Sequence, residues 1–281
     1  MNRLKILIAD GNTRETDAAH VAAGGNPTGE HYARVLRSLR ADLECIVLHP
    51  ARDGAVLPSG AELAAFDGIA WTGSALNVYK DIPAVRAQID LCRAAFAAGV
   101  PQFGSCWGLQ VAAVAAGGVV RANPRGRELG VARRIALTHA GSAHPMFQNK
   151  HSPFDAIAVH MDEISELPPG ATVLASNAVS EIQAAEIRYQ AGIFWGTQYH
   201  PEYDFNEIAT VILRYGSRLV DAGIFADMPT LVRYADDLRT LHADASRKDL
   251  AWLYGLSDDV LEPANRRSEL KQWVEWQVIK K

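Results

Sequence analysis

Residues 101–110 read PQFGSCWGLQ and predict a short buried strand that turns sharply into a helix, with Cys106 at the apex. A turn this tight strains the backbone of the apex residue and leaves no room for side chains beside it, which suits Gly104 and Gly108. The thiol would stand above the first turn of the helix, where unpaired N–H groups and the helix dipole favour the thiolate. Hydrolases with a G-x-S-x-G motif present their serine in the same way.

The segments before this turn alternate between strand and helix patterns. Continuous apolar runs at 4–9, 43–48 and 66–71 predict buried parallel strands. Apolar residues at helical spacing predict helices at 31–40 and 82–96. This order predicts an α/β protein, a flavodoxin-like three-layer sandwich with a mostly parallel central sheet.

The second half of the chain changes character twice. After a predicted helix at 107–116, further strands are predicted at 119–122, 129–138, 155–160, 172–176, 184–189 and 193–199. Short turns separate them, which indicates hairpins and a β-rich extension of the sheet. From residue 206 the pattern is helical, and Ser246 with Asp249 resembles a capping box. We therefore expect an α/β domain over residues 1–221 and a helical C-terminal extension over residues 222–281.

Composition limits the classes of partner. Of 281 residues, 48% are hydrophobic and 21% charged, which is typical of a soluble globular protein, and the net charge of -4 gives no reason to expect nucleic acid or an anionic membrane. No window approaches the roughly 20 apolar residues of a membrane span, and the N-terminus lacks a signal-peptide core. Small-molecule or protein partners are expected.

The cysteines and histidines are scattered. Cys45, Cys92 and Cys106 show no C-x-x-C spacing, which argues against a disulfide framework or a structural zinc site and fits a reducing cytoplasm. Cys45 and Cys92 lie in apolar patterns and are interpreted as core residues. The histidines form no metal-binding motif, so neither a metal nor a cofactor is expected.

Residues 11–30 are predicted to form a loop that is long for a compact α/β unit, as lids and binding loops often are. The glycines of 24–29 superficially suggest a phosphate cradle. However, Glu30 and His31 stand where a P-loop needs Lys and Ser or Thr, so phosphate binding is not predicted.

A cysteine nucleophile needs a base, and the base needs a group that fixes its tautomer. His200 and Glu202 sit at i and i+2 at the end of an extended segment, so their side chains share one face. Glu202 can then bind one ring nitrogen of His200 while the other faces the thiol of Cys106. Spacing alone leaves a structural role open for these residues.

Two predicted turns offer backbone N–H donors for an oxyanion: Gly73, after the strand that ends at residue 71, and Trp107, directly after Cys106. His160 with Asp162 is a further candidate pair, because it lies at a strand end, where active-site residues gather in α/β sheets. A structural role is equally open for this pair.

Taken together, these motifs resemble the class I (triad-type) glutamine amidotransferases, in particular the amidotransferase domain of GMP synthase and its free-standing relatives. The likeness extends over roughly residues 4–215. The matching motifs are GSCWGLQ at 104–110, YHPE at 199–202, WTGS at 71–74, ELG at 128–130, IALT at 135–138, AVHMDE at 158–163 and QAA at 183–185.

The resemblance implies a cysteine nucleophile at Cys106, a base at His200 and an orienting carboxylate at Glu202, acting on the side-chain amide of glutamine to release ammonia. It also implies an oxyanion and glutamine pocket, formed by Gly73, Ser74, Trp107, Gly108, Gln110 and His160. Relatives of this kind pass ammonia to an acceptor or synthetase protein, which the resemblance leaves unidentified.

The chain also departs from that pattern. Residues 203–281 contain no S-G-G-x-D-S loop and are too few for an ATP-pyrophosphatase domain, and the 11–30 segment replaces a short turn. The leading hypothesis is a glutamine-hydrolysing enzyme that feeds an acceptor. The alternatives are a γ-glutamyl hydrolase acting on another γ-glutamyl amide, and a non-catalytic regulatory module that binds through its tryptophan-containing tail. The C-terminal helices are expected to support self-association.

Overall fold

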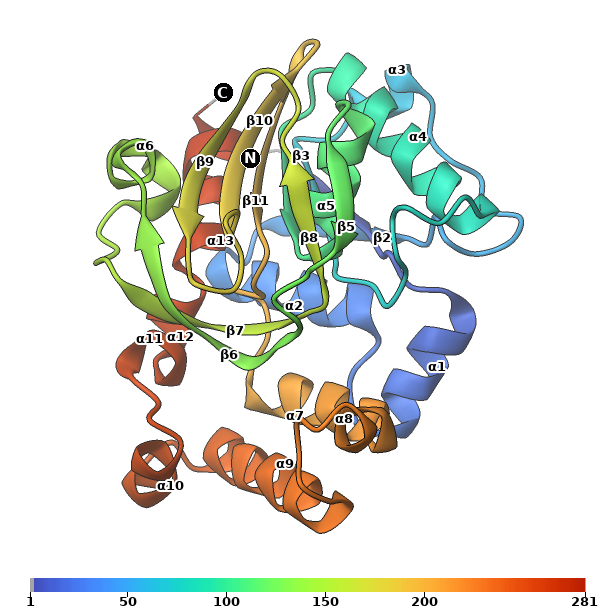
Figure 1. The fold of residues 1–281 in the computed structure, drawn as a ribbon. Coiled ribbons are helices and arrows are strands. Elements are labelled where there is room, and N and C mark those ends of the chain that lie inside the picture. Colours follow the sequence, from blue (N-terminus) through green and yellow to red (C-terminus); the bar gives the residue numbers. More distant parts are fainter. Residues whose placement is uncertain (1–2, 281) are drawn as a thin grey trace.

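Nine strands of the described residues, 3–280, form one sheet in the computed structural model (Figure 1), in the order β2-β1-β3-β4-β11-β10-β9-β6-β7. Their bounds are β1 Leu4–Ala9, β2 Leu43–Leu48, β3 Gly68–Trp71, β4 Gln102–Ser105, β6 Glu128–Leu137, β7 Phe154–His160, β9 Ala171–Ser176, β10 Ala184–Tyr189 and β11 Gly192–Thr197. Neighbouring strands are parallel in the half of the sheet that contains β2, β1, β3, β4 and β11. The pairings of β10, β9, β6 and β7 are antiparallel. A separate antiparallel pair joins β5 Val119–Ala122 to β8 Asp162–Glu166.

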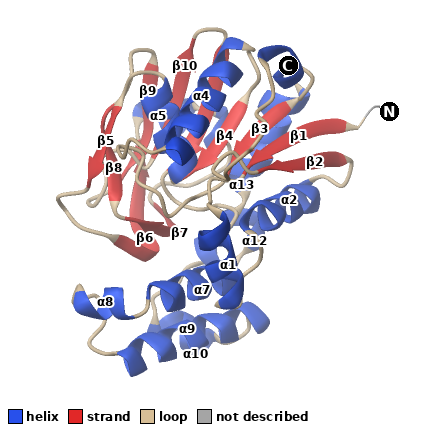
Figure 2. Ribbon diagram, turned by 90° about the vertical axis from the view of Figure 1, so that its right-hand side faces the viewer, coloured by secondary structure: helices blue, strands red, loops and turns tan. Residues whose placement is uncertain are grey.

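Helices cover both faces of the parallel half, and several more lie together at one end of the sheet (Figures 1 and 2). The α-helices are α1 Arg14–Ala22, α2 Thr28–Leu39, α3 Gly60–Leu63, α4 Pro83–Ala97, α5 Trp107–Ala115, α6 His139–Ala143, α7 Phe205–Tyr215, α8 Ser217–Asp221, α9 Met228–Ala243, α10 Lys248–Leu253, α11 Asp258–Leu261, α12 Pro263–Arg266 and α13 Ser268–Trp273. A 3₁₀ turn covers Pro145–Phe147, and a π-helix, Val274–Ile279, continues α13. The expected α/β sandwich is confirmed.

The core has one apolar layer on each face of the sheet, because side chains alternate along a strand. From β1, Ile6 and Ile8 point into the layer that contains α2 and α13. Leu7 and Ala9 point into the opposite layer, which contains α4 and α5. The continuous apolar run of β1 is thus explained by burial on both faces.

From the sequence we expected the segment 11–30 to be a loop. The structure shows that part of it is helical. It contains α1, which begins after an N-cap at Thr13, and the first turn of α2. Helix α1 has no apolar stripe, and its buried residues are the polar Asp17 and His20. Hydrophobic periodicity cannot detect such a helix, since hydrogen bonds rather than apolar contacts hold it in place. Strand β8, DEISE, was missed for the same reason, because its sequence is mostly polar.

The C-terminal helices divide into two groups. Helices α9 and α10 pack with α7 in a third apolar cluster, whereas α13 and the π-helix return to the main sheet. There Trp273 is fully buried, with its ring 5.9 Å from that of Phe103. The division of the chain after residue 221 stays a prediction. The expected capping box is absent, because α10 follows Arg247 and the Ser246 hydroxyl donates to Asp244 instead.

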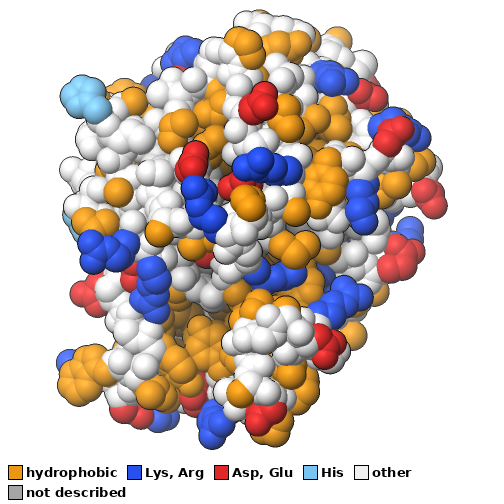
Figure 3. Space-filling view, in the orientation of Figure 1, with side chains coloured by type: hydrophobic (Ala, Val, Ile, Leu, Met, Phe, Trp, Pro, Cys, Tyr) orange, Lys and Arg blue, Asp and Glu red, His pale blue; other side chains and the backbone are white. Residues whose placement is uncertain are grey.

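Apolar side chains are also exposed on this part of the surface. They gather at the lower left of Figure 3, where α9 and α10 lie, and Trp252 of α10 is 79% exposed. Self-association through these helices stays a prediction. None of the helices within residues 3–280 has both the length and the apolar character that crossing a membrane requires.

Candidate active site

Cys106 occupies the tight turn between β4 and α5. Its backbone has φ 50° and ψ −98°, in a region that non-glycine residues rarely adopt. The Cys106 N–H donates a 2.7 Å hydrogen bond to the Thr197 carbonyl at the end of β11, and its carbonyl accepts from Gln110 N–H. The strained turn predicted from the sequence is therefore present, and it directs the thiol away from the sheet.

The glycines beside this turn allow close packing. A Cβ atom on Gly104 would lie 2.6 Å from the ring of Phe194 and 2.8 Å from the Gly108 backbone. A Cβ atom on Gly108 would lie 2.5 Å from the Trp71 side chain. Real Cβ atoms essentially never come this close to their neighbours, so any larger residue would push α5 away from the sheet.

His200 and Glu202 follow β11, which is the parallel neighbour of β4. Because parallel neighbours end at the same edge of a sheet, this pairing brings His200 and Glu202, about 90 positions further along the chain, beside Cys106. His200 Nδ1 lies 2.7 Å from Glu202 Oε1, and both side chains are buried. Burial by itself lowers the pKa of His200, but the Glu202 carboxylate and the neighbouring Cys106 sulfur outweigh it and raise this pKa to about 10.

The other ring nitrogen of His200, Nε2, faces the thiol. Within residues 3–280 this buried nitrogen has no hydrogen-bond partner, and the thiol donates at 3.7 Å to the Val159 carbonyl instead. The imidazole also stacks on the Tyr203 ring, with 4.0 Å between centroids and 13° between planes. Stacking and the bond to Glu202 together fix the ring, so that one nitrogen is oriented by a carboxylate and the other is available to the sulfur.

Besides its contact with His200, Glu202 is fixed by a hydrogen-bond network. Its Oε2 accepts a 2.7 Å bond from the Ser105 hydroxyl, which is in turn 3.3 Å from the hydroxyl of Tyr32. The backbone carbonyl of Glu202 is 2.9 Å from His31 Nε2. Each carboxylate oxygen of Glu202 therefore has a partner, and the carboxylate cannot rotate without breaking one of these bonds.

Helix α7 is fastened to the N-terminal segment by a buried carboxylate, Glu207. Its oxygens lie 2.8 Å from His20 Nε2 and 3.6 Å from His31 Nδ1, and Asn26 donates to it as well. Burial would raise the pKa of Glu207, but the hydrogen bond to His20 and the neighbouring His31 outweigh it and lower this pKa. This polar cluster attaches α1 and α2 to the wall of the site.

The two predicted oxyanion donors both lie beside Cys106: Trp107 follows it in the chain, and Gly73 lines the same pocket. The Gly73 backbone lies against the imidazole, since a Cβ atom there would be 2.6 Å from His200 Cε1. Asn12 Nδ2 and the Thr72 hydroxyl donate to the Gly73 carbonyl and hold this loop. Within the described chain, the N–H groups of Gly73 and Trp107 bond no protein acceptor. Both are therefore available to an oxygen bound above Cys106.

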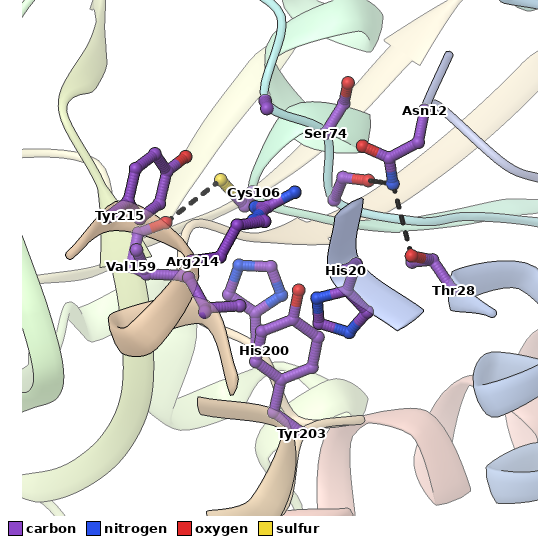
Figure 4. A pocket seen from close by; sticks show the side chains of 13 residues that line it. Asn12, His20, Thr28, Ser74, Cys106, Val159, His200, Tyr203, Arg214 and Tyr215 are labelled. Carbon is purple, nitrogen blue, oxygen red and sulfur yellow. Dashed lines mark hydrogen bonds between the residues drawn. The ribbon is translucent and has the colours of Figure 1, made fainter. Parts of the chain in front are cut away.

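Two adjoining pockets open at Cys106, and Figure 4 shows the smaller one. The smaller has a volume of about 30 Å³ and the larger about 200 Å³. They share Ser74, Ala75, Cys106, Val159 and Tyr215. Only the smaller is lined by Asn12, His20, Thr28, Gly73, His200, Tyr203, Val211 and Arg214, and only the larger by Leu76, Asn77, Gln110, Arg127, His160, Met161, Asp162 and Arg218.

The predicted pocket residues occupy different places in this arrangement. Gln110 lines the larger pocket and donates to Gln198 Oε1 and the Asp162 carbonyl. The ring nitrogens of His160 are both engaged, 2.8 Å from Glu128 Oε2 and 3.1 Å from the Asp162 carbonyl, so this histidine shapes the wall. The Ser74 hydroxyl donates to the Gly11 carbonyl.

The remaining predicted residues can also be placed. The indole of Trp107 is buried and donates to Gln88, so only its backbone faces the site. Cys92 is fully buried, as expected, and burial raises its pKa, whereas Cys45 is half-buried. No group of three His, Cys, Asp or Glu within residues 3–280 is arranged to hold a metal ion.

The sequence analysis missed most of the smaller pocket. Its outer residues Asn12, His20 and Thr28 come from the 11–30 segment, and Tyr203 and Arg214 come from α7 and the turn before it. Only Asn12 had a usable signal, because it follows a buried strand at the carboxyl edge where ligands bind in α/β sheets. The others belong to no motif.

Comparison with known proteins agrees with this geometry. The family model described as "Glutamine amidotransferase class-I" matches residues 30–217. The chain belongs to this family. The resemblance noted in the sequence is thus confirmed, and the cysteine turn and the His200–Glu202 pair lie inside the matched range of this class I amidotransferase.

Individual relatives add detail. The chain is 34% identical to a gamma-glutamyl-L-1-hydroxyisopropylamide hydrolase of Pseudomonas sp. over 284 aligned residues, which cover 99% of this chain and 95% of that protein. It is 30% identical to a GMP synthase [glutamine-hydrolyzing] of Nitrosomonas eutropha over 215 residues, 74% of this chain but only 39% of that relative. A glutamine amidotransferase structure from Thermotoga maritima covers 99% of the chain with a TM-score of 0.66 at 18% identity, which supports the fold.

Proposed function

We propose that this protein is a γ-glutamyl amide hydrolase that cleaves small N-substituted γ-glutamyl amides into glutamate and an amine. The observation that carries the proposal is the extent of the similarity to the Pseudomonas hydrolase, which covers 99% of the chain. That match includes segments that the family model, ending at residue 217, does not cover, whereas the GMP synthase match covers 74%. The proposal replaces glutamine, our leading sequence-based hypothesis, with the γ-glutamyl alternative.

The geometry supports a thioester mechanism. The Cys106 thiolate attacks the γ-carbonyl carbon, and the N–H groups of Gly73 and Trp107 stabilise the oxyanion. His200 Nε2 gives its proton to the amide nitrogen, so the C–N bond breaks and the neutral amine leaves. His200 then takes a proton from water, which attacks the thioester and releases glutamate, and the sulfur leaves as thiolate with His200 again protonated.

The larger pocket suits the glutamyl half of such a substrate. Arg127 lines it, with its guanidinium 4.8 Å from the centre of the Tyr215 ring. A guanidinium at this position is suited to the α-carboxylate of a γ-glutamyl group. The side chain of Gln110 and the carbonyl of Asp162 offer further polar atoms at the same wall.

Glutamine hydrolysis with ammonia passed to an acceptor protein is the second candidate. It is favoured by the similarity to GMP synthases, although the chain spans only 39% of the Nitrosomonas relative. The two candidates share every catalytic step and differ only in the leaving group. A non-catalytic binding module is the third candidate, and the presence of a complete Cys106, His200 and Glu202 set argues against it.

Substrate competition tests the proposal. Purified protein would be offered L-glutamine and γ-glutamyl hydroxyisopropylamide, the amide in the name of the Pseudomonas hydrolase, with glutamate release and thioester formation at Cys106 followed by mass spectrometry. We expect a kcat/KM at least about tenfold higher for the substituted amide, no turnover in Cys106→Ala, and full turnover in Cys45→Ser. Preference for glutamine would favour the second candidate, and absence of turnover with either amide would favour the third.

A further inference from the structure

The smaller pocket contains polar groups that no protein atom satisfies. Within residues 3–280, neither the hydroxyl of Tyr203 nor the guanidinium of Arg214 has a hydrogen-bond or ion-pair partner, and Arg214 Nε is buried. The guanidinium of Arg214 lies 5.2 Å from the centroid of the Tyr215 ring. Figure 4 shows Tyr203, Arg214 and Cys106 around the same space. Two unsatisfied donors beside a nucleophile indicate a ligand atom that accepts hydrogen bonds.

The position of His200 decides which part of a substrate enters this pocket. His200 lines the smaller pocket and not the larger, whereas Cys106 lines both. The leaving amine must take its proton from His200 Nε2, so it has to lie on the side of His200. The scissile C–N bond therefore crosses the boundary at Cys106, with the γ-glutamyl group in the larger pocket and the amine in the smaller.

We infer that the smaller pocket is the leaving-amine subsite, and that Tyr203 and Arg214 are its specificity-determining residues, which bind a hydroxyl group on the leaving amine. The amide for which the Pseudomonas relative is named carries such a hydroxyl. This inference rests on the proposed function. Ammonia, the leaving group of glutamine, would offer no oxygen to either donor, and a plain alkylamine would leave both unpaired. Sites built to bind a substrate hydroxyl reject analogues that lack it for this reason.

Size and charge narrow the class of amine. A volume of about 30 Å³ admits only a small substituent without movement of the walls. An amine with its own carboxylate is disfavoured, because two buried carboxylates stand directly behind the pocket: Glu202 behind His200, and Glu207 behind His20. A compact, neutral hydroxyalkylamine meets both conditions.

The inference also assigns a role to the 11–30 segment, as one wall of the leaving-amine subsite. Asn12, His20 and Thr28 form the wall opposite Arg214, and Glu207 of α7 holds that wall through His20. Most of this segment precedes residue 30, where the match to the family model begins. One wall of the amine pocket thus comes from the part of the chain that departs from the family pattern, whereas Tyr203 and Arg214 lie within the matched range.

A matched pair of substrates tests the assignment: γ-glutamyl-2-hydroxyethylamide, and γ-glutamyl-n-propylamide, in which a methyl replaces the hydroxyl. We expect the wild-type protein to prefer the hydroxyl amide by about 10- to 100-fold in kcat/KM. Tyr203→Phe keeps the ring that stacks on His200, and Arg214→Met keeps most of the side-chain length. Each should lower the preference about tenfold, mainly through the hydroxyl amide, while Arg233→Met on the exposed face of α9 should not change it.

The outcomes separate this inference from the proposed function. Hydrolysis of both amides with the same ratio in the wild type and both variants would overturn the subsite assignment and leave the hydrolase proposal intact. Preference for γ-glutamylglycine would show that Arg214 binds a carboxylate and would overturn the neutral-amine assignment. Hydrolysis of neither amide would overturn the proposed function and this inference together. Thermal unfolding of each variant checks that the ratios come from folded protein.

Discussion

The Ser105 hydroxyl donates a 2.7 Å hydrogen bond to Glu202 Oε2. This bond joins the residue next to Cys106 to the carboxylate that orients His200. The strained turn on β4 and the base after β11 are therefore connected through side chains as well as through the neighbouring strands. A change on either strand is expected to affect the other.

Ser105→Ala tests this connection. It leaves Glu202 Oε2 buried without its donor, and a hydrogen bond to a charged group contributes about 1.5–3 kcal/mol. We expect kcat/KM for a γ-glutamyl amide to fall at least about tenfold. Ser142→Ala, at an exposed position of α6, is the matched control and should retain full activity. Equal activity in the two variants would show that the bond does not serve the reaction.

Glu202→Gln removes the charge that holds His200 in place. Since this carboxylate helps raise the pKa of His200 to about 10, the imidazolium should lose its proton at lower pH in the variant. We expect kcat/KM to fall by roughly 100- to 10,000-fold, less than the complete loss in Cys106→Ala. The basic limb of its pH profile should also move to lower pH. Glu262→Gln, at an exposed position, is the control and should keep the wild-type pH profile. If the basic limb does not move in Glu202→Gln, Glu202 is not the carboxylate that raises the pKa of His200.

Gly73→Ala places a methyl group against the base. The new Cβ atom would lie 2.6 Å from His200 Cε1, and the ring cannot easily retreat because it stacks on Tyr203. Displacement of a catalytic group by about 1 Å can cost about 100-fold in rate, so we expect a loss of that order in kcat. Gly60→Ala, where the added Cβ meets nothing within 4 Å, should leave kcat unchanged.

Trp273→Ala tests whether the end of the chain belongs to the main core. The side chain is fully buried beside Phe103, and truncation of a buried Trp typically lowers the free energy of unfolding by about 3–5 kcal/mol. Urea denaturation should show a loss of this size. Trp252→Ala, at a residue 79% exposed on α10, should change the free energy of unfolding by less than about 0.5 kcal/mol. Similar losses in both would argue against this packing.

Glu186 should make stability depend on acid pH. Burial would raise the pKa of its carboxyl, but hydrogen bonds from His144, Arg188 and Trp195 lower this pKa from 4.5 to about 2. A carboxyl with a depressed pKa stabilises the fold above its unfolded value, and this stabilisation is lost as the pH falls from 4.5 through about 2.

Glu186→Gln is therefore expected to lower the free energy of unfolding at pH 6 and to approach the wild-type value near pH 2. Denaturation curves at several pH values provide the measurement. The exposed Glu166→Gln should follow the wild type throughout. A difference between Glu186→Gln and the wild type that stays constant from pH 6 to pH 2 would mean that Glu186 does not titrate as described.

Local patterns predicted most of the fold. The strands at 4–9, 43–48 and 184–189 have the predicted bounds, because their apolar or alternating residues reflect burial against the sheet. Prediction failed where the buried residues are polar. Helix α1 is held through His20 and Asp17, and no periodicity of apolar residues marks it.

The sequence by itself determined the strained cysteine turn, the alternating order of strands and helices, and the His-x-Glu pair, because each depends on residue types that are close together along the chain. Only the tertiary structure decided what surrounds Cys106. The parallel pairing of β4 with β11 brings His200 beside the thiol, and the docking of α1 and α7 places His20, Tyr203 and Arg214 around the smaller pocket. Those contacts join segments almost 200 residues apart through polar bonds, which leave no periodic signal in the sequence.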